Sequence, residues 1–275
     1  MKVRPYLSIV IPAFDEARRI ERSLQEIVQY LEQRPFPSEV IVVDDGSRDA
    51  TAAIVRAFAD TWSSEHVCVR LLRNERNFGK GYSVRRGFLH ARGEIVLFTD
   101  ADLSTPIAEA ERLLRIIETE GADVAFGSRG LDQRFILKPQ SLLRRWAGRI
   151  FNLLMRALTG LPFKDTQCGF KAYRRESMLP IFRSQRIFGF GFDVEILYLA
   201  RKRGLRLRET PVLWANAEGT KVRLGRDAWR TAFDLLRIRM NDWRGRYASL
   251  EAERGMTRKG SETLSPSTPS VDGAS

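Results

Sequence analysis

The amino-acid sequence predicts an α/β fold in which a mostly parallel sheet is flanked by helices. Short runs rich in β-branched and aromatic residues alternate with segments whose apolar residues recur at helical spacing, which is typical of βαβ units. The chain has 275 residues, of which 43% are hydrophobic, so it can bury one sizeable core. The predicted strands cover residues 6–11, 39–45, 67–72, 94–100 and 122–127.

Helical segments are expected between these strands. The first follows Pro12, the second begins near Asp49 and Thr51, and the third covers residues 79–91. The fourth opens at Thr105-Pro106, because proline is favoured in the first turn of a helix. The buried stripe of the first helix is expected to consist of Ile20, Leu24, Ile27 and Leu31.

Carboxylates follow two of the predicted strands, at Asp44-Asp45 and at Asp100-Ala101-Asp102. Ionised carboxylates at the mouth of a parallel sheet cost desolvation energy unless a cation or a hydrogen-bond donor meets them. A divalent metal that carries a nucleotide diphosphate would satisfy both pairs. We therefore expect a nucleotide to lie across the strand ends, where three loops converge. These loops are residues 12–16, 44–49 and 100–105.

Asp100 and Asp102 are the candidate ligands of Mg²⁺ or Mn²⁺. Alternate residues of an extended chain point to opposite sides, so both carboxylates face one ion only where the chain bends. These ions take few protein oxygens and complete their shell with substrate phosphate oxygens. A solvated turn is the alternative for a bare Asp-X-Asp, but the apolar strand before it and Leu103-Ser104-Thr105-Pro106 after it favour the metal site.

Asp44 is expected to accept a hydrogen bond from the base or ribose of the nucleotide. Gly46 lets the backbone approach the ligand. The same segment also suits the start of the following helix, with Ser47 or Asp49 as the N-cap, and the two interpretations are compatible.

The segment Asn77-Phe78-Gly79-Lys80-Gly81 is a glycine-rich loop that leads into a helix. Backbone amides at such a helix start can contact an anion, and Lys80 is a candidate phosphate contact, with a solvated helix start as the alternative. The sequence contains neither a phosphate-binding P-loop motif nor G-x-G-x-x-G after a strand.

Two segments of the second half combine apolar and basic faces. Cationic amphipathic helices with Trp at their edges suit a membrane interface, whereas ordinary core aromatics are the alternative. The first has Leu142, Leu143, Trp146, Ile150, Leu153, Leu154 and Ala157 on one face and Arg145, Arg149 and Arg156 on the other. The second has Trp229, Ala232, Phe233, Leu236, Met240 and Trp243, with Arg226, Arg230, Arg237 and Arg244 beside them.

The formal net charge of +12 favours a polyanionic partner: nucleic acid, an anionic membrane surface or a phosphorylated substrate. Basic residues here accompany Trp-bearing helices rather than a stacking platform, so we expect a membrane surface and no nucleic acid. Two cysteines exclude a disulfide framework, and no uncharged apolar window is long enough to span a bilayer. We expect a cytoplasmic protein attached peripherally to the cytoplasmic face of a membrane.

Several ordered motifs between about residues 6 and 247 resemble the family 2 glycosyltransferases of the GT-A fold. They are Ile9–Glu16, Val42–Ser47, Asn77–Gly81, Thr99–Pro106 and Gly127–Arg129. Asp165–Lys171, Gly191–Glu195 and Thr220–Arg223 are similar to the dolichyl-phosphate β-glucosyltransferase branch. The expected transferase domain covers residues 1–248, with a nucleotide half to about 130, an acceptor and membrane half from about 131, and a disordered tail over 249–275.

The resemblance implies a transfer of glucose from UDP-glucose to a polyprenyl phosphate, dolichyl or undecaprenyl, with inversion. GDP-mannose as donor, a sugar hydroxyl as acceptor, and a catalytically silent membrane scaffold are the alternatives. The residues expected at the nucleotide-sugar are Pro12, Asp15, Glu16, Asp44, Asp45, Lys80, Asp100 and Ala101. Arg129, Lys171 and Arg223 are expected near the acceptor phosphate or the transferred sugar, and Asp100 and Asp102 at the metal. Asp15 stands where the family commonly has Asn.

The predicted catalytic residues are Asp193, Arg129 and Lys171. A phosphate acceptor is already an anion at neutral pH, so we expect no strong general base and assign more weight to the cations that orient it. Asp193 is the candidate base if one operates. Alternatively, Asp193 and Glu195 fix sugar hydroxyls or pair with nearby Lys and Arg.

Overall fold

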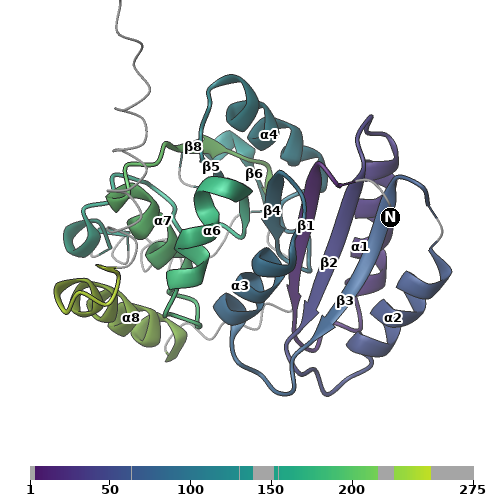
Figure 1. The fold of residues 1–275 in the computed structure, drawn as a ribbon, viewed down its shortest axis with the longest axis horizontal. Helices are drawn as coiled ribbons and strands as arrows, with labels where there is room; N and C mark the ends of the chain where they lie inside the picture. The colour runs from purple at the N-terminus through teal and green to yellow at the C-terminus, as the bar shows by residue number, and fades with distance from the viewer. Residues whose placement is uncertain are drawn as a thin grey trace, which may run out of the picture.

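The computed structural model describes residues 4–62, 64–129, 131–138, 152–153, 155–215 and 226–248. Its centre is a seven-stranded sheet of order β3-β2-β1-β4-β7-β5-β8 (Figure 1). The strands are β1 (Leu7–Ala13), β2 (Ser38–Asp44), β3 (Val67–Arg73), β4 (Ile95–Thr99), β5 (Val124–Ser128), β7 (Phe170–Arg174) and β8 (Leu207–Pro211). Strand β7 is antiparallel to β4 and β5, and the other pairs are parallel. A second small sheet pairs β6 (Ile136–Lys138) with β9 (Trp214–Ala215).

Helices cover both faces of the large sheet (Figure 1). They are α1 (Ile20–Glu32), α2 (Thr51–Thr61), α3 (Lys80–His90), α4 (Ala110–Thr119), α6 (Arg175–Ser184), α7 (Phe192–Lys202) and α8 (Arg226–Trp243), with 3-10 turns η1 (Ile107–Glu109) and η2 (Gln133–Phe135). Ile9 and Ile11 of β1 face a core built with α1 and α4, while Val10 faces a second core built with α3, α6 and α7. This alternation follows from the period of two residues in a strand.

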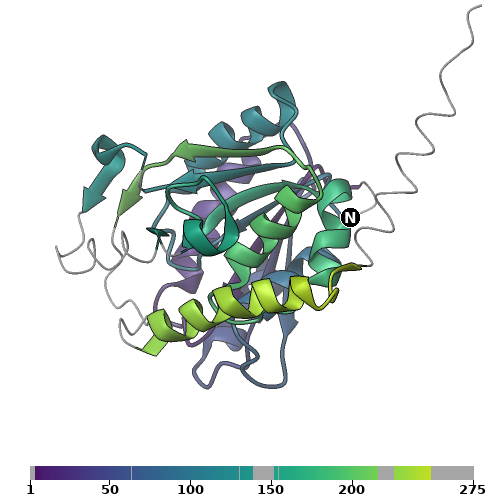
Figure 2. The same ribbon diagram turned by 90° about the vertical axis from the view of Figure 1, so that its left-hand side faces the viewer.

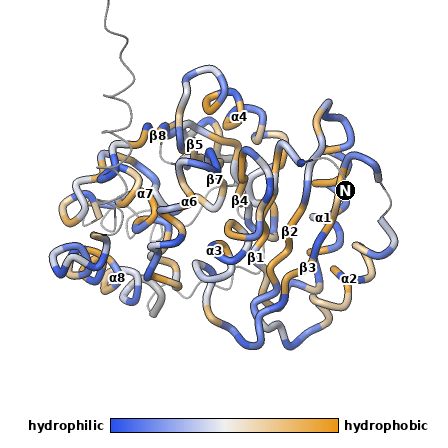
Figure 3. Tube along the Cα trace, viewed as in Figure 1, coloured by the Kyte–Doolittle hydropathy of each residue, from blue (hydrophilic) through white to orange (hydrophobic). Residues whose placement is uncertain are grey.

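The register of the first three strands brings their carboxyl ends together. Ala13 lies opposite Asp44, and Asp44 lies opposite Arg73. The apolar strands therefore give way to polar loops along one edge of the sheet, at the bottom of Figure 3, where the tube changes from orange to blue. This edge is where the sequence predicts ligand binding.

The predicted fold class is confirmed. Each predicted strand has a counterpart whose bounds differ by a few residues, and the four predicted stripe residues of α1 are fully buried. The sequence analysis did not identify β7, the strand that runs against its neighbours. The predicted N-cap of the second helix is wrong: the N-cap of α2 is Ala50, which has no side-chain cap, although Asp49 Oδ1 accepts a hydrogen bond from Thr51 N at 3.0 Å.

Of the two predicted amphipathic segments, the structure describes the second as α8 and only a small part of the first. Most of residues 142–157 lies outside the described residues, including Trp146, Arg145 and Arg149. In α8, Trp229 and Trp243 are 72% and 89% exposed, so they are not core aromatics. Among the described residues, no helix is both long and apolar enough to cross a membrane. Residues 249–275 also lie outside the described residues, and the predicted division into halves stays a prediction.

Candidate active site

The loops after β1 and β2 are tied to each other by hydrogen bonds. Asp15 N donates to Ser47 Oγ at 2.9 Å, and Arg48 N donates to Asp15 Oδ1 at 2.8 Å. Glu16 N donates to Thr51 Oγ1 at 2.7 Å. These bonds bring Asp15 and Glu16 beside the 44–49 loop, as the sequence predicts.

Asp15 has a φ of 52°, in the left-handed region. Asp and Asn adopt this conformation more readily than most other residues, because their short polar side chains can hydrogen-bond locally. Asp at this position therefore keeps the backbone turn that Asn would provide, while adding a negative charge.

Asp44 is fully buried at the end of β2. Its Oδ1 accepts a hydrogen bond from Ser47 N at 3.2 Å, and its Oδ2 lies 3.2 Å from Arg73 Nε. Half of the Arg73 side chain is exposed, so this guanidinium connects the buried carboxylate of Asp44 to the surface. A ligand could displace Arg73 from this position. The nucleotide contact predicted for Asp44 stays a prediction.

Asp45 has a different environment from Asp44. Its Oδ1 accepts hydrogen bonds from Asn74 Nδ2 at 2.7 Å and Phe78 N at 3.0 Å, and its Oδ2 accepts one from Gly79 N at 2.9 Å. The carboxylate therefore fixes the glycine-rich loop that precedes Lys80. These contacts indicate a positioning role for a residue that the sequence analysis assigned to direct nucleotide binding.

Asp100 and Lys80 form an ion pair at the same edge of the sheet, with Oδ1 and Nζ 2.6 Å apart. Burial opposes the charged form of Lys80, but the carboxylates of Asp100 and Asp193 raise its pKa above the ordinary value. Asp102 also acts on this ammonium, and its Oδ2 lies 3.9 Å from Arg19 Nη1. Lys80 is therefore a constrained cation rather than a solvated helix start.

Asp100 and Asp102 supply the type of oxygen donor that a hard divalent cation prefers. Both Asp100 and Asp102 offer carboxylate oxygens, and cationic side chains already lie beside each of them. Among the described residues, no group of three or more His, Cys, Asp or Glu side chains could hold a metal ion. A cation held here would take its remaining oxygens from donor phosphates and water.

Lys171 and Asp193 form a second, deeper ion pair. Lys171 is fully buried in β7, and its Nζ lies 2.7 Å from Asp193 Oδ1 in the first turn of α7. The same Nζ also donates to the backbone oxygen of Cys168. Burial raises the pKa of Asp193 above the ordinary value, with Lys171 and Lys80 opposing the rise.

The ring of Phe98 joins the two ion pairs. Lys80 Nζ lies 5.2 Å and Lys171 Nζ 5.8 Å from its centroid. Asp193 was the candidate base of the sequence analysis, but its pairing with a buried ammonium favours the alternative in which it binds a nearby Lys. Lys171 has no exposed surface, so in this arrangement it acts through Asp193.

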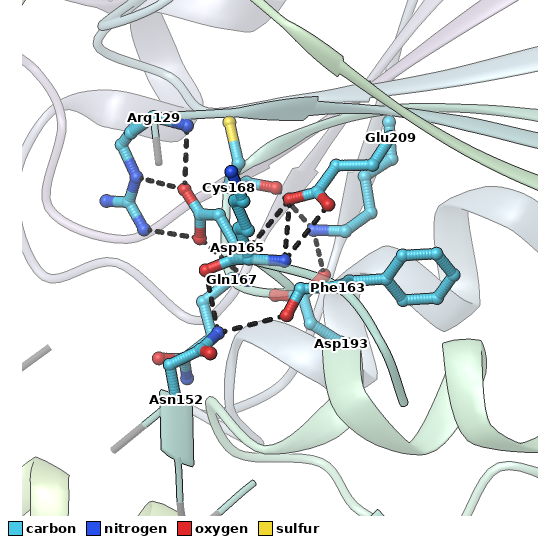
Figure 4. Close-up of polar contacts among 10 residues, drawn as sticks. Arg129, Asn152, Phe163, Asp165, Gln167, Cys168, Asp193 and Glu209 are labelled. Carbon is cyan, nitrogen blue, oxygen red and sulfur yellow. Dashed lines mark hydrogen bonds and ion pairs between the residues drawn. The ribbon is translucent and has the colours of Figure 1, made fainter. Parts of the chain in front are cut away.

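Arg129 is held by a network that follows β5 (Figure 4). Its Nε and Nη2 donate to the two carboxylate oxygens of Asp165 at 2.6 and 2.9 Å, and its backbone N donates to the same carboxylate at 3.0 Å. The guanidinium also lies over the ring of Trp214, 5.6 Å from the centroid. Such a bidentate, stacked arrangement fixes the orientation of the side chain.

Glu209 of β8 supports Asp165 from the other side. Its carboxylate accepts hydrogen bonds from Asp165 N at 2.7 Å and from Lys164 N at 3.0 Å (Figure 4). Burial opposes the ionised form of Asp165, yet Arg129 lowers the pKa of this carboxyl below its ordinary value. The sequence analysis gave neither Asp165 nor Glu209 a role, because the partners lie 36 and 44 residues apart from Asp165 along the chain.

The remaining predicted site residues are placed as follows. Pro12 lies in β1 opposite Val43, and the backbone oxygen of Ala101 accepts a hydrogen bond from Ser23 Oγ at 2.7 Å. Arg223 lies outside the described residues. The structure thus pairs Lys80 with Asp100 and Lys171 with Asp193 around Phe98, and it pairs Arg129 with Asp165.

The sequence profile described as "Glycosyl transferase family 2" matches residues 8–182. The chain belongs to this family. Dolichyl-phosphate beta-glucosyltransferase of Dictyostelium discoideum is 35% identical over 244 residues, which cover 85% of this chain and 74% of the relative. The human protein of the same name is 33% identical over 260 residues, covering 91% of this chain and 79% of the relative.

Solved structures share the fold at lower identity. Glucosyl-3-phosphoglycerate synthase from Mycobacterium tuberculosis, in complex with UDP, has a TM-score of 0.61 at 21% identity, covering 85% of this chain and 80% of that one. A mannosyltransferase from Pyrobaculum calidifontis, in complex with GDP-Man and Mn²⁺, has a TM-score of 0.54 at 23% identity, covering 84% and 61%. These similarities place the chain in the GT-A fold.

Proposed function

We propose that this protein transfers glucose from UDP-glucose to a polyprenyl phosphate at a membrane surface, with inversion at the anomeric carbon. The observation that carries the proposal is the cluster in which Lys80–Asp100 and Lys171–Asp193 meet around Phe98. Relatives at 33% to 36% identity are named dolichyl-phosphate β-glucosyltransferases, which supports both the glucosyl donor and the lipid acceptor.

In this proposal the cationic side chains bind the phosphate groups of the donor and the acceptor, and the carboxylates bind the metal. An acceptor phosphate oxygen attacks the anomeric carbon, the bond from that carbon to the diphosphate oxygen breaks, and UDP leaves. Lys80 stabilises the negative charge that develops on the diphosphate. A divalent metal held by Asp100 and Asp102 would supply further Lewis-acid stabilisation of that charge. Arg129 orients the acceptor anion.

The acceptor needs no strong base, since a phosphate monoester is already ionised at neutral pH. Asp193 then serves to hold Lys171 and to keep the local charge balanced. An Asp193→Asn enzyme is expected to lose much less than ten-thousandfold in turnover while UDP binding stays intact. A loss of that size with donor binding unchanged would instead assign base catalysis to Asp193.

The direct test is incubation of the purified protein with Mn²⁺, UDP-glucose and a short polyprenyl phosphate, followed by mass spectrometry of the lipid. We expect a hexosyl phosphoryl lipid, which an Asp100→Asn variant fails to form. Efficient transfer from GDP-mannose but not from UDP-glucose would contradict the proposed donor. Transfer only to a sugar hydroxyl would contradict the proposed acceptor.

Helix α8 supports the membrane part of the proposal. Its outward face carries five exposed large apolar side chains: Trp229, Phe233, Leu236, Met240 and Trp243. Leu235 and Ile238 on its other face are fully buried. An exposed apolar stripe beside arginines suits the interface of an anionic membrane.

Sedimentation with anionic vesicles tests this surface. We expect binding at low salt that is weakened by Trp243→Ser and by Arg244→Glu. Arg22→Glu is the matched control, because Arg22 is an exposed arginine on α1 and its reversal changes the net charge equally. Equal loss of binding in both charge-reversal variants would indicate a general charge effect, and absence of binding would contradict the membrane assignment.

A further inference from the structure

Two exposed aromatic side chains lie between the candidate active site and α8. Phe188 and Phe190, in the loop that joins α6 to α7, are each 38% exposed. Outside α8, the exposed large apolar side chains of the described residues are these two and Leu153. The exposure of two phenylalanines in one short loop indicates contact with an apolar partner.

Backbone contacts hold this loop against the helix that carries Lys80. Tyr82 N donates to Phe188 O at 3.3 Å, and Gln185 Nε2 donates to Gly81 O at 3.0 Å. A Cβ at Gly79 would lie 2.5 Å from Phe188 O, so only glycine permits the approach. The loop is therefore fixed to the start of α3, next to the Lys80–Asp100 pair.

The other side of the loop is fixed to α7 and α8. Glu195 accepts hydrogen bonds from Arg186 N at 3.1 Å, from Ile187 N at 2.9 Å and from Tyr247 Oη at 2.5 Å. A Cβ at Gly191 would lie 2.5 Å from Asp234 Cβ, which follows Phe233 of the apolar stripe. Figure 2 shows α8 in yellow-green running across the face that also presents α7. The aromatic loop is thus anchored at both ends and held near one turn of α8.

The aromatic surface continues toward the nucleotide loops. Phe188 meets Tyr82 edge-on, with centroids 5.5 Å apart, and Tyr82 lies 4.7 Å from Phe78. Asp193 follows Phe190 by three residues and pairs with Lys171. The loop aromatics therefore contact the glycine-rich loop on one side, and the loop itself approaches α8 at Asp234 on the other.

We propose that Phe188 and Phe190 bind the first isoprene units of the lipid acceptor, so that they set the requirement for a hydrocarbon chain next to the acceptor phosphate. The inference rests on the proposed function. In this arrangement the acceptor phosphate lies near Arg129, and its tail runs across the loop toward the membrane at α8. A rigid aromatic surface gains free energy by covering such a chain, without the entropy that a flexible loop would lose.

The test uses a water-soluble ten-carbon prenyl phosphate below its micellar concentration, without vesicles, and ethyl phosphate for comparison. We expect the wild-type protein to prefer the prenyl acceptor. Phe190→Ser and Phe188→Ser are expected to raise KM for the prenyl phosphate about tenfold each, the effect of exposing one to two methylene groups. The KM for UDP-glucose is expected to stay unchanged. A Phe190→Leu variant, which keeps an apolar side chain, is expected to retain most of the affinity for the prenyl phosphate that Phe190→Ser loses.

Trp243→Ser is the matched control, since it removes an exposed aromatic from the end of α8 far along the chain from the loop. It is expected to weaken vesicle binding and to leave the kinetics of the soluble acceptor unchanged. Loop variants that lose vesicle binding but keep the wild-type KM for the soluble acceptor would overturn the inference and make the loop a membrane anchor. Equal changes in both substrates' KM would also overturn it.

The two proposals fail in different ways. A wild-type protein that glucosylates no prenyl phosphate overturns the proposed function and this inference together. A wild-type protein that glucosylates the ten-carbon acceptor, with loop variants that behave identically, overturns this inference alone.

Discussion

Two regions of this protein hold their charged residues by different means: the proposed donor edge, formed by the loops after β1, β2 and β4, and the proposed acceptor side, formed by Arg129 and Lys171 with their partners. At the donor edge, the carboxylates of Asp15, in the loop after β1, and Asp44, at the end of β2, accept hydrogen bonds from backbone N–H groups of the loop after β2. On the acceptor side, Arg129 and Lys171 are each held by a carboxylate from another element, Asp165 and Asp193. The carboxylates at the donor edge are therefore held by backbone N–H groups and by partly exposed cations such as Arg73 and Lys80, whereas Lys171 and Asp193 form an ion pair that is almost completely buried.

This difference predicts how each region responds to substitution. A turn that loses one carboxylate keeps its other hydrogen bonds, so function suffers more than stability. A buried ion pair that loses one partner leaves an uncompensated charge, so stability suffers as well.

The largest expected effect is on catalysis at the donor edge. Asp100→Ala is expected to lower kcat/KM by about 10⁴-fold, because it removes the proposed metal-ligating carboxylate and the partner of Lys80. Steady-state glucosyl transfer measures the effect, and Asp60→Asn, an exposed carboxylate at the end of α2, is the control. A melting temperature close to wild type would support the view that the partly exposed Lys80–Asp100 pair contributes little to stability, and cooperative unfolding at a much lower temperature would contradict it.

The second effect is on the stability of the acceptor side. Lys171→Met is expected to destabilise the fold by about 3–5 kcal/mol, since it leaves Asp193 buried without its cation. Adding Asp193→Leu to the same protein is expected to recover most of that loss without restoring activity. Urea unfolding measures both.

The exposed i,i+4 pair of Arg22 and Glu26 provides the control for that experiment. Arg22→Met is expected to change the unfolding free energy by less than about 0.5 kcal/mol. A Lys171→Met protein as stable as Arg22→Met would refute the contrast between the two regions.

Asp165 provides a second test of the acceptor side, because it is expected to act by orienting Arg129 rather than by contacting the substrate. Asp165→Asn is expected to raise KM for the acceptor about 30-fold, because Arg129 loses the bidentate carboxylate that orients its guanidinium. The KM for UDP-glucose is expected to stay unchanged. Kinetics with each substrate varied in turn distinguish this outcome from general damage, which would move both.

The same variant has an expected pH signature. Because the folded pKa of Asp165 is lowered, the stability its carboxylate contributes is present above the unfolded pKa of about 4 and is lost as pH falls through the folded value. The difference in unfolding free energy between wild type and Asp165→Asn should therefore shrink as pH falls below about 4. A difference independent of pH would contradict the ion pair.

The smallest expected effect concerns Lys80. Its ammonium lies 2.6 Å from Asp100 Oδ1 and competes with any divalent cation for that oxygen. Lys80→Met is expected to tighten Mn²⁺ binding about three- to tenfold in the absence of donor, while lowering turnover. Electron paramagnetic resonance of free Mn²⁺ measures the binding, and weaker binding in the variant would contradict the competition.

The sequence by itself determined strands β1 to β5, the helices between them and the carboxylates that follow β2 and β4. These features depend on contiguous patterns. A run of apolar residues shows where a strand ends, and a parallel sheet brings the carboxyl ends of its strands to one edge. It also predicted the amphipathic face of α8, because helical spacing sorts residues by face without any other element.

Only the tertiary structure decided which charges meet. Lys80, Asp100, Lys171 and Asp193 come from four elements, and Asp165 reaches Arg129 across 36 residues. The spacing of the α8 tryptophans also could not show whether they are buried or exposed. An apolar stripe has the same sequence pattern whether or not a neighbouring element covers it. The physical reason is that ion pairing and burial depend on distances between segments, which a linear pattern does not contain.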